Sequence, residues 1–121
     1  MAETYKRGSV ALVRFPYTDL SDSKVRPAVI VTADTYLTQA DDVLCAFLSS
    51  VLPDPLLPTD IILSSTHPDF RRTGLKRSSV LRTHKLMLLD REPVYSKLGD
   101  LSPILVKQMN AALTDALGLD E

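Results

Sequence analysis

The chain has 121 residues, and its 45% hydrophobic content is enough for the core of one compact unit, so we expect residues 1–121 to form a single domain. Its formal net charge of −1 excludes a surface that is basic throughout, so any binding of nucleic acid must depend on a local patch of positive charge. The single cysteine, Cys45, excludes an internal disulfide, and together with the lack of a signal-peptide-like or membrane-spanning apolar stretch it predicts a cytoplasmic protein.

A β-hairpin is the first element that the sequence predicts. Residues 9–15 mix apolar and small side chains, and residues 28–32 are continuously apolar, as in a buried strand. The polar segment between them, which we expect to be a mobile loop, ends in Arg26 and Pro27. Proline restrains the backbone of the preceding residue to an extended conformation, so the guanidinium of Arg26 is expected at the mouth of the second strand, where it suits an anion site.

Further short strands are expected in the middle of the chain. The polar residues 33–42 indicate a loop with one helical turn, and the three prolines of residues 53–58 exclude regular structure there. Residues 65–73 form a polar, basic segment between two of the predicted strands. The strands predicted around these segments are residues 43–49, residues 60–64, one or two strands within residues 79–89, and residues 94–98.

A C-terminal helix is the element with the clearest local signals. Ser102 can cap its first turn, Pro103 suits its first position and Gly118 ends it. One apolar stripe at helical spacing must dock on the sheet; its members are Leu105, Met109, Ala112, Leu113 and Ala116. Short strands followed by one helix predict a mostly β protein with a small, curled, mainly antiparallel sheet and a C-terminal helix.

Four segments of the sequence together carry a family resemblance. The first is VALVRFP, followed closely by TDLS and KVRPAVIV; the others are LCAFLSS, GLKRSSVLRTHKLMLL and KLGDLS. In this order and spacing they resemble the MazF/PemK family of toxin endoribonucleases over nearly the whole chain. The resemblance implies an SH3-like barrel, a homodimer with an RNA groove across the subunit interface, and a cognate antitoxin whose disordered tail folds into that groove.

Arg26 is the first candidate catalytic residue. Metal-independent RNA cleavage needs removal of the 2′-hydroxyl proton, stabilisation of the charged phosphorane and protonation of the departing 5′-oxygen. Arg26 falls on the arginine of the family's R-P motif, and its guanidinium fork can bind phosphate oxygens. Because a guanidinium releases its proton reluctantly, electrostatic stabilisation is its first expected role and general acid catalysis its second. The alternative is an arginine that only ties the loop to a carboxylate.

Ser49 is the second candidate catalytic residue. It stands where the family usually has threonine, in the segment Phe47-Leu48-Ser49-Ser50, and its hydroxyl could donate to a phosphate oxygen or position the 2′-hydroxyl. The alternative is a strand-end serine that bonds to its own backbone. A shift of one position in the register would instead make Ser50 the functional hydroxyl.

Other residues are expected to contact RNA, namely Lys24, Ser50, Arg82 and Thr83. Arg82 and Thr83 fall on an arginine-threonine step of the family, but Val80 replaces a polar residue two places earlier, which argues against base recognition there. His84 lies on the same side of a strand as Arg82 and could join it. Residues 70–89 contain six basic residues and no acidic one, which indicates either an RNA-facing patch or a solvated face.

The leading hypothesis is a sequence-selective toxin endoribonuclease that cleaves single-stranded RNA by attack of its own 2′-hydroxyl. The sequence has no metal-ligand spacing and no glycine-rich phosphate loop, so we expect no metal and no cofactor. One alternative is a non-catalytic SH3-like barrel that binds RNA or a peptide after losing activity through Ser49 and Val80. Another is a toxin of the same fold that inhibits a protein such as gyrase.

Overall fold

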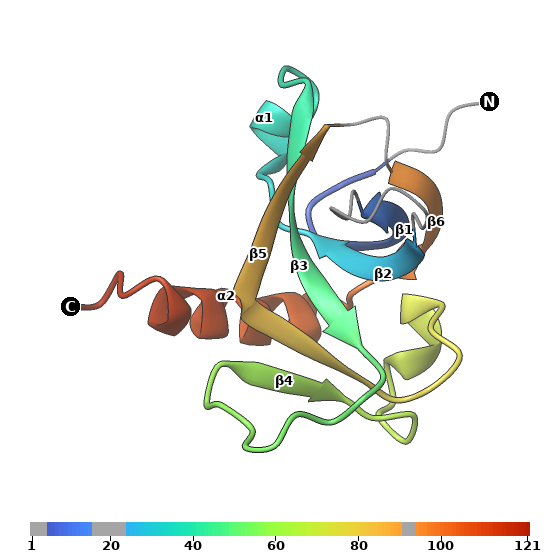
Figure 1. The fold of residues 1–121 in the computed structure, drawn as a ribbon, viewed down its shortest axis with the longest axis vertical. Helices are drawn as coiled ribbons and strands as arrows, with labels where there is room; N and C mark the ends of the chain where they lie inside the picture. The colour runs from blue at the N-terminus through green and yellow to red at the C-terminus, as the bar shows by residue number, and fades with distance from the viewer. Residues whose placement is uncertain (1–4, 16–23, 91–93) are drawn as a thin grey trace.

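The fold is seen in a computed structural model that describes residues 5–15, 24–90 and 94–121 (Figure 1). The loop expected to be mobile falls largely on residues 16–23 and lies outside this part. The strands are β1 (Ser9–Phe15), β2 (Lys24–Ile30), β3 (Asp42–Ser49), β4 (Asp60–Leu63), β5 (Ser79–Asp90) and β6 (Val94–Asp100), and the helices are α1 (Asp34–Leu37), the 3-10 turn η1 (Phe70–Thr73) and α2 (Pro103–Ala116).

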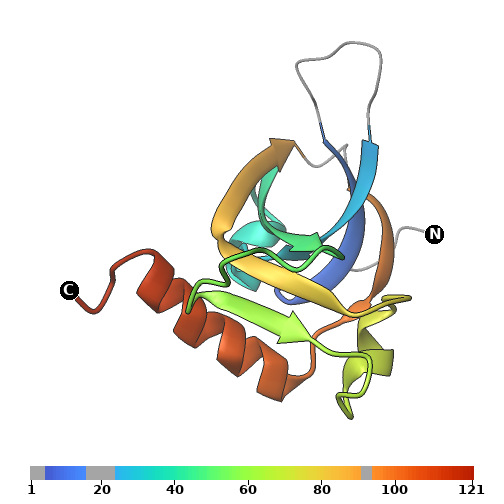
Figure 2. The same cartoon turned by 60° about the horizontal axis from the view of Figure 1, so that its bottom comes forward.

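The six strands form one antiparallel sheet in the order β4-β5-β3-β2-β1-β6. Register shifts between β1 and β6 and between β3 and β5 mark irregularities at which such ladders bend. The sheet therefore curls into a half-barrel, with α2 running alongside β4 (Figure 2). This architecture confirms the predicted mostly β fold with a C-terminal helix.

Both faces of the curled sheet carry an apolar cluster, and neighbouring residues of a strand can join different clusters because their side chains point to opposite sides. On β2, Val29 packs with the buried stripe of α2, formed by Leu105, Met109 and Leu113. The adjacent Ile30 packs with Leu37 of α1 on the other side. The sheet is thus held between two apolar clusters.

The helix α2 begins and ends close to where the sequence signals place it. The hydroxyl of Ser102 accepts a hydrogen bond from the backbone N–H of Leu105 at 3.3 Å, and Pro103 occupies the first turn. Gly118, in the left-handed region at φ 67°, follows the last turn. None of the helices in the described part of the chain is long and apolar enough to cross a membrane.

Two strands differ from the sequence-based expectation. β2 begins at Lys24 rather than at residue 28, because Arg26 and Pro27 continue the pairing with β1 opposite Val13 and Leu12. β5 is one continuous strand of 12 residues that pairs with β3 along one edge and with β4 along the other.

Candidate active site

The sheet opens between the first half of β2 and the end of β3. Pairing between these strands covers only Ala28 to Ile30 on β2, and Ala28 lies opposite Phe47. Proline has no backbone N–H to donate, so Pro27 cannot extend this ladder with a hydrogen bond. Arg26 and Pro27 therefore stay paired with β1 but separate from the end of β3.

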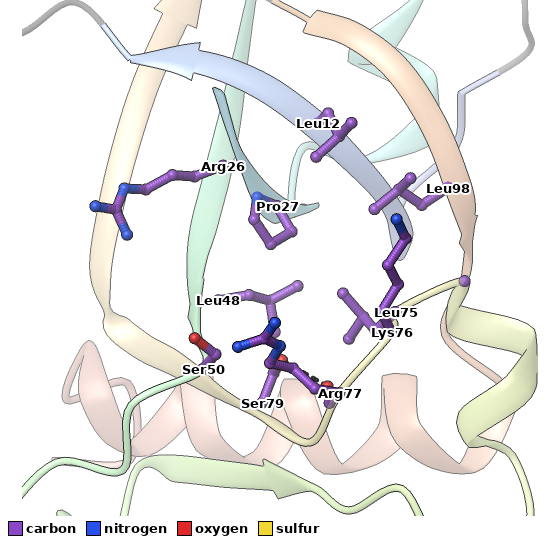
Figure 3. Close-up of a pocket in the computed structure, with 11 residues that line it drawn as sticks. Leu12, Arg26, Pro27, Leu48, Ser50, Leu75, Lys76, Arg77, Ser79 and Leu98 are labelled. Atoms are coloured by element: carbon purple, nitrogen blue, oxygen red, sulfur yellow. Dashed lines mark hydrogen bonds between the residues drawn. The ribbon is translucent and has the colours of Figure 1, made fainter. Parts of the chain in front are cut away.

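A pocket of about 400 Å³ occupies this opening (Figure 3). Its lining combines apolar side chains from five different strands or loops with three cations and two hydroxyl groups. The lining residues are Leu12, Arg26, Pro27, Leu48, Ser50, Gly74, Leu75, Lys76, Arg77, Ser79 and Leu98.

The cations of the pocket come from two segments far apart in the sequence. Arg26 stands on β2, whereas Lys76 and Arg77 precede β5, and all three are exposed. Among the described residues no carboxylate forms an ion pair with Arg26, so the alternative of an arginine tied to a described carboxylate is not what is seen. Three cations around one opening can bind an anion, and the guanidiniums can do so with paired hydrogen bonds.

The two adjacent serines have different surroundings. Ser50 lines the pocket together with Leu48, two residues before it. The Ser49 hydroxyl accepts a hydrogen bond from the backbone N–H of Val51 and donates to its carbonyl, both at 3.1 Å. These bonds match the alternative of a strand-end serine that bonds to its own backbone, and the hydroxyl brought to the pocket is that of Ser50. Ser50 is therefore the candidate hydroxyl of the site, and a catalytic role for Ser49 is kept as the alternative to be tested.

Arg82 and His84 do lie on one side of β5, as expected, but they face a carboxylate. Arg82 Nε donates to Asp60 Oδ1 at 3.0 Å and its Nη2 to Oδ2 at 3.4 Å, and His84 Nδ1 lies 3.8 Å from Oδ1. Burial disfavours the charged form of Asp60, yet the Arg82 bond, the Leu57 N–H and the nearby positive charges outweigh it and lower the carboxyl pKa below 3.8. RNA contact by Arg82 stays a prediction.

Thr83 is fully buried, and its hydroxyl donates to the carbonyl of Thr59 at 2.7 Å. The residue therefore holds the segment before β4 against β5, and its expected contact with RNA stays a prediction. Val80 is also buried, opposite Ser49 on β3 and Ile62 on β4. A side chain in that position cannot read a base, as its apolar character indicates.

Three further basic residues, Lys24, Lys76 and Arg77, differ in how the sequence predicted them. Lys24 begins β2 opposite Phe15, but its side chain lies outside the described part, so its contact with RNA stays a prediction. Lys76 and Arg77 were expected only as members of the basic run and not as neighbours of Arg26. The run indicated positive charge, but the curl of the sheet that brings Lys76 and Arg77 to the same pocket as Arg26 could not be read from composition.

A reactive thiol and a metal-ligand cluster are two further kinds of catalytic group to consider. Burial raises the pKa of the Cys45 thiol to about 12, so it stays a neutral side chain within the core. Across residues 5–15, 24–90 and 94–121, no three His, Cys, Asp or Glu side chains are grouped to hold a metal ion.

The half-barrel and the pocket lined by three cations define a small β protein with a positively charged cavity between β2 and β3. The chain belongs to the family of PemK-like, MazF-like toxins of type II toxin-antitoxin systems, whose model matches residues 6–117. A comparison with curated protein sequences gives no match.

Several solved structures share this fold at low sequence identity. An endoribonuclease in complex with its cognate antitoxin, from a mycobacterial species, is 22% identical, with 96% of this chain and 97% of the other covered and a TM-score of 0.74. MazF (Form-I) from Deinococcus radiodurans is 17% identical, with 97% and 99% covered and a TM-score of 0.74. The MazE-MazF (Form-II) structure from the same organism is 16% identical, with 97% and 98% covered and a TM-score of 0.75.

Proposed function

We propose that this protein is a toxin endoribonuclease that cleaves single-stranded RNA in the pocket between β2 and β3. The observation that carries the proposal is the meeting of Arg26, Lys76 and Arg77 around one cavity with the hydroxyl of Ser50. Membership of the toxin family supports it, as does the shared fold with proteins described as endoribonucleases.

The proposed reaction uses the RNA's own 2′-oxygen. A bond forms between this oxygen and phosphorus, the bond to the 5′-oxygen breaks, and the proton lost by the 2′-hydroxyl is balanced by one gained at the leaving oxygen. Arg26 stabilises the charge that builds up on the phosphorane oxygens, and general acid catalysis is its secondary role. Ser50 donates a hydrogen bond to the phosphate or holds the 2′-hydroxyl in line.

The same positive pocket suits a second partner. A related structure contains an endoribonuclease together with its cognate antitoxin. We propose that a cognate antitoxin restrains this protein too, with a disordered segment whose carboxylates take the place of RNA phosphates beside Arg26 and Arg77. Selectivity for an RNA sequence and a homodimeric state are parts of the same proposal.

One assay tests the cleavage. Purified protein is incubated with end-labelled single-stranded RNA in excess EDTA, beside the Arg26→Ala variant. Discrete cuts that disappear in the variant support the proposal. Binding without cuts would instead indicate a non-catalytic RNA-binding barrel, and neither binding nor cuts would indicate a toxin with a protein target.

A further inference from the structure

A second cavity, of about 600 Å³, lies next to the proposed active site. It is lined by Ser65, His67, Pro68, Phe70, Arg71, Gly74 and Leu75. We propose that this cavity is a second nucleotide subsite, which holds a nucleotide of the RNA strand outside the scissile phosphate. The inference rests on the proposed function, because it assumes that RNA enters the first pocket.

The two cavities are neighbours that share two lining residues. Gly74 and Leu75 line both of them, so a strand that leaves the first pocket meets the second across these residues. Gly74 has no side chain to separate the cavities, and its φ of 72° is one that other residues rarely adopt. A continuous polyanion such as RNA can therefore occupy both.

The lining has the groups that bind a nucleotide without depending on its identity. Phe70 offers an aromatic ring on which a base can stack, and the exposed guanidinium of Arg71 can bind a phosphate. His67 Nδ1 accepts a hydrogen bond from the backbone N–H of Asp69 at 3.0 Å. In its neutral form the ring therefore carries its hydrogen on Nε2, as a donor.

The segment that carries these residues is held in place before any ligand arrives. Thr73 is fully buried; its hydroxyl donates to the carbonyl of Phe70 at 2.6 Å and accepts from the N–H of Leu75 at 3.1 Å. Gly99 of β6 lies so close to Arg72 and Thr73 that any Cβ there would collide with their backbone. A subsite built on a fixed backbone loses little entropy on binding.

Nucleic acid fits this cavity better than an acidic peptide does. A peptide carboxylate would use Arg71 alone, whereas a nucleotide uses both the cation and the ring of Phe70. Binding of an acidic peptide in this cavity is the alternative that the test distinguishes.

The test compares two adjacent, exposed arginines, of which Arg71 lines the cavity and Arg72 is not among its lining residues. The probe is a fluorescent, random-sequence 2′-O-methyl RNA, which binds without being cut, and affinity is measured by anisotropy at several salt concentrations. Arg71→Ala should weaken binding and reduce the slope of log affinity against log salt by about 0.7, the value for one lost phosphate contact on a single strand. Arg72→Ala should leave the slope unchanged.

Two further measurements test whether the loss of RNA affinity arises at the second cavity. Phe70→Ala should weaken binding of the long probe about fivefold or more, the loss expected for one stacked base, and Phe70→Tyr should retain it. Against a dinucleotide probe, which can bind in the first pocket alone, Arg71→Ala should lose less affinity than it does against the long probe.

Equal salt slopes for Arg71→Ala and Arg72→Ala would overturn the subsite, even if the unmodified protein cleaves RNA. A loss confined to binding of an acidic peptide would overturn it in favour of a peptide site. A protein that never cuts RNA, yet loses long-probe affinity only through Arg71 and Phe70, would retain the subsite and refute the nuclease.

Discussion

Arg26 is the side chain on which the proposed chemistry depends most. Arg26→Ala should lower the cleavage rate by about 10²–10³-fold, the usual cost of removing one group that stabilises the transition state. Because the side chain is exposed, the melting temperature should not change. Arg26→Lys should give an intermediate rate, since an ammonium keeps the charge but loses the paired hydrogen bonds. Single-turnover kinetics with thermal unfolding as the control checks this, and a fully active Arg26→Ala protein would move the site elsewhere.

The paired serines give a comparison between neighbours. Ser50→Ala should reduce the cleavage rate more than RNA affinity, because the lost hydroxyl faces the pocket. Ser49→Ala should leave cleavage nearly unchanged and lower the free energy of unfolding by about 0.5–1.5 kcal/mol, through loss of its hydrogen bonds to Val51. Measured rates, affinities and urea unfolding separate the two. The reverse pattern would restore Ser49 as the functional hydroxyl.

Asp60 of β4 and Arg82 of β5 form an ion pair that links these two strands. The Asp60 side chain is fully buried and that of Arg82 is 16% exposed, so removing either partner leaves the other charge poorly compensated. Asp60→Ala should destabilise the fold by about 3 kcal/mol or more at neutral pH. Chemical unfolding of this variant beside an exposed control, Asp120→Ala, measures the loss.

The same pair predicts how stability depends on pH. The folded pKa of Asp60 is lowered, so its contribution is complete above the ordinary value of 3.8 and is lost as the pH falls through the lower, folded value. The difference in unfolding free energy between the natural protein and Asp60→Asn should therefore shrink as the pH falls from 3.8 through the lower, folded pKa of Asp60. Urea titrations at a series of pH values test this, and a difference that stays constant would mean that the carboxylate charge is not what stabilises the pair.

At the scale of the elements, local signals were sufficient for most of the fold. The start of α2 depends on Ser102 and Pro103, which act on the first turn alone, so the sequence was enough to predict it. The roles of Arg82 and Thr83 depend on which strand pairs with β5. Their partners, Asp60 and Thr59, are more than twenty residues away, so no local pattern could reveal that both side chains are engaged inside the fold.

For the molecule as a whole, the arrangement of charge matters more than its sum. The net charge is −1, yet Arg26, Lys76 and Arg77 line one cavity and Arg71 lines its neighbour. The basic run of residues 70–89 could be seen in the sequence, but its proximity to Arg26 follows from the curl of the sheet. Composition alone thus underestimates the attraction of this surface for a polyanion.

The substrate requirement is the prediction that involves the whole site. Among the described residues that line the pocket none is Asp or Glu, so its polar groups are suited to stabilise negative charge. In the reaction we propose, the nucleophile is the RNA's 2′-oxygen. Products should carry a 2′,3′-cyclic phosphate or 3′-phosphate and a 5′-hydroxyl.

A single 2′-deoxy or 2′-O-methyl nucleotide placed 5′ of the cut should abolish cleavage there while leaving binding nearly unchanged, because phosphate contacts by Arg26 and Arg77 do not involve the 2′-oxygen. Mass spectrometry of the products measures cleavage, and anisotropy measures binding. DNA of the same sequence should be inert. Cleavage that survives the modified nucleotide would show that water attacks the phosphate, and the roles proposed for Arg26 and Ser50 would then have to be replaced by a mechanism that activates water.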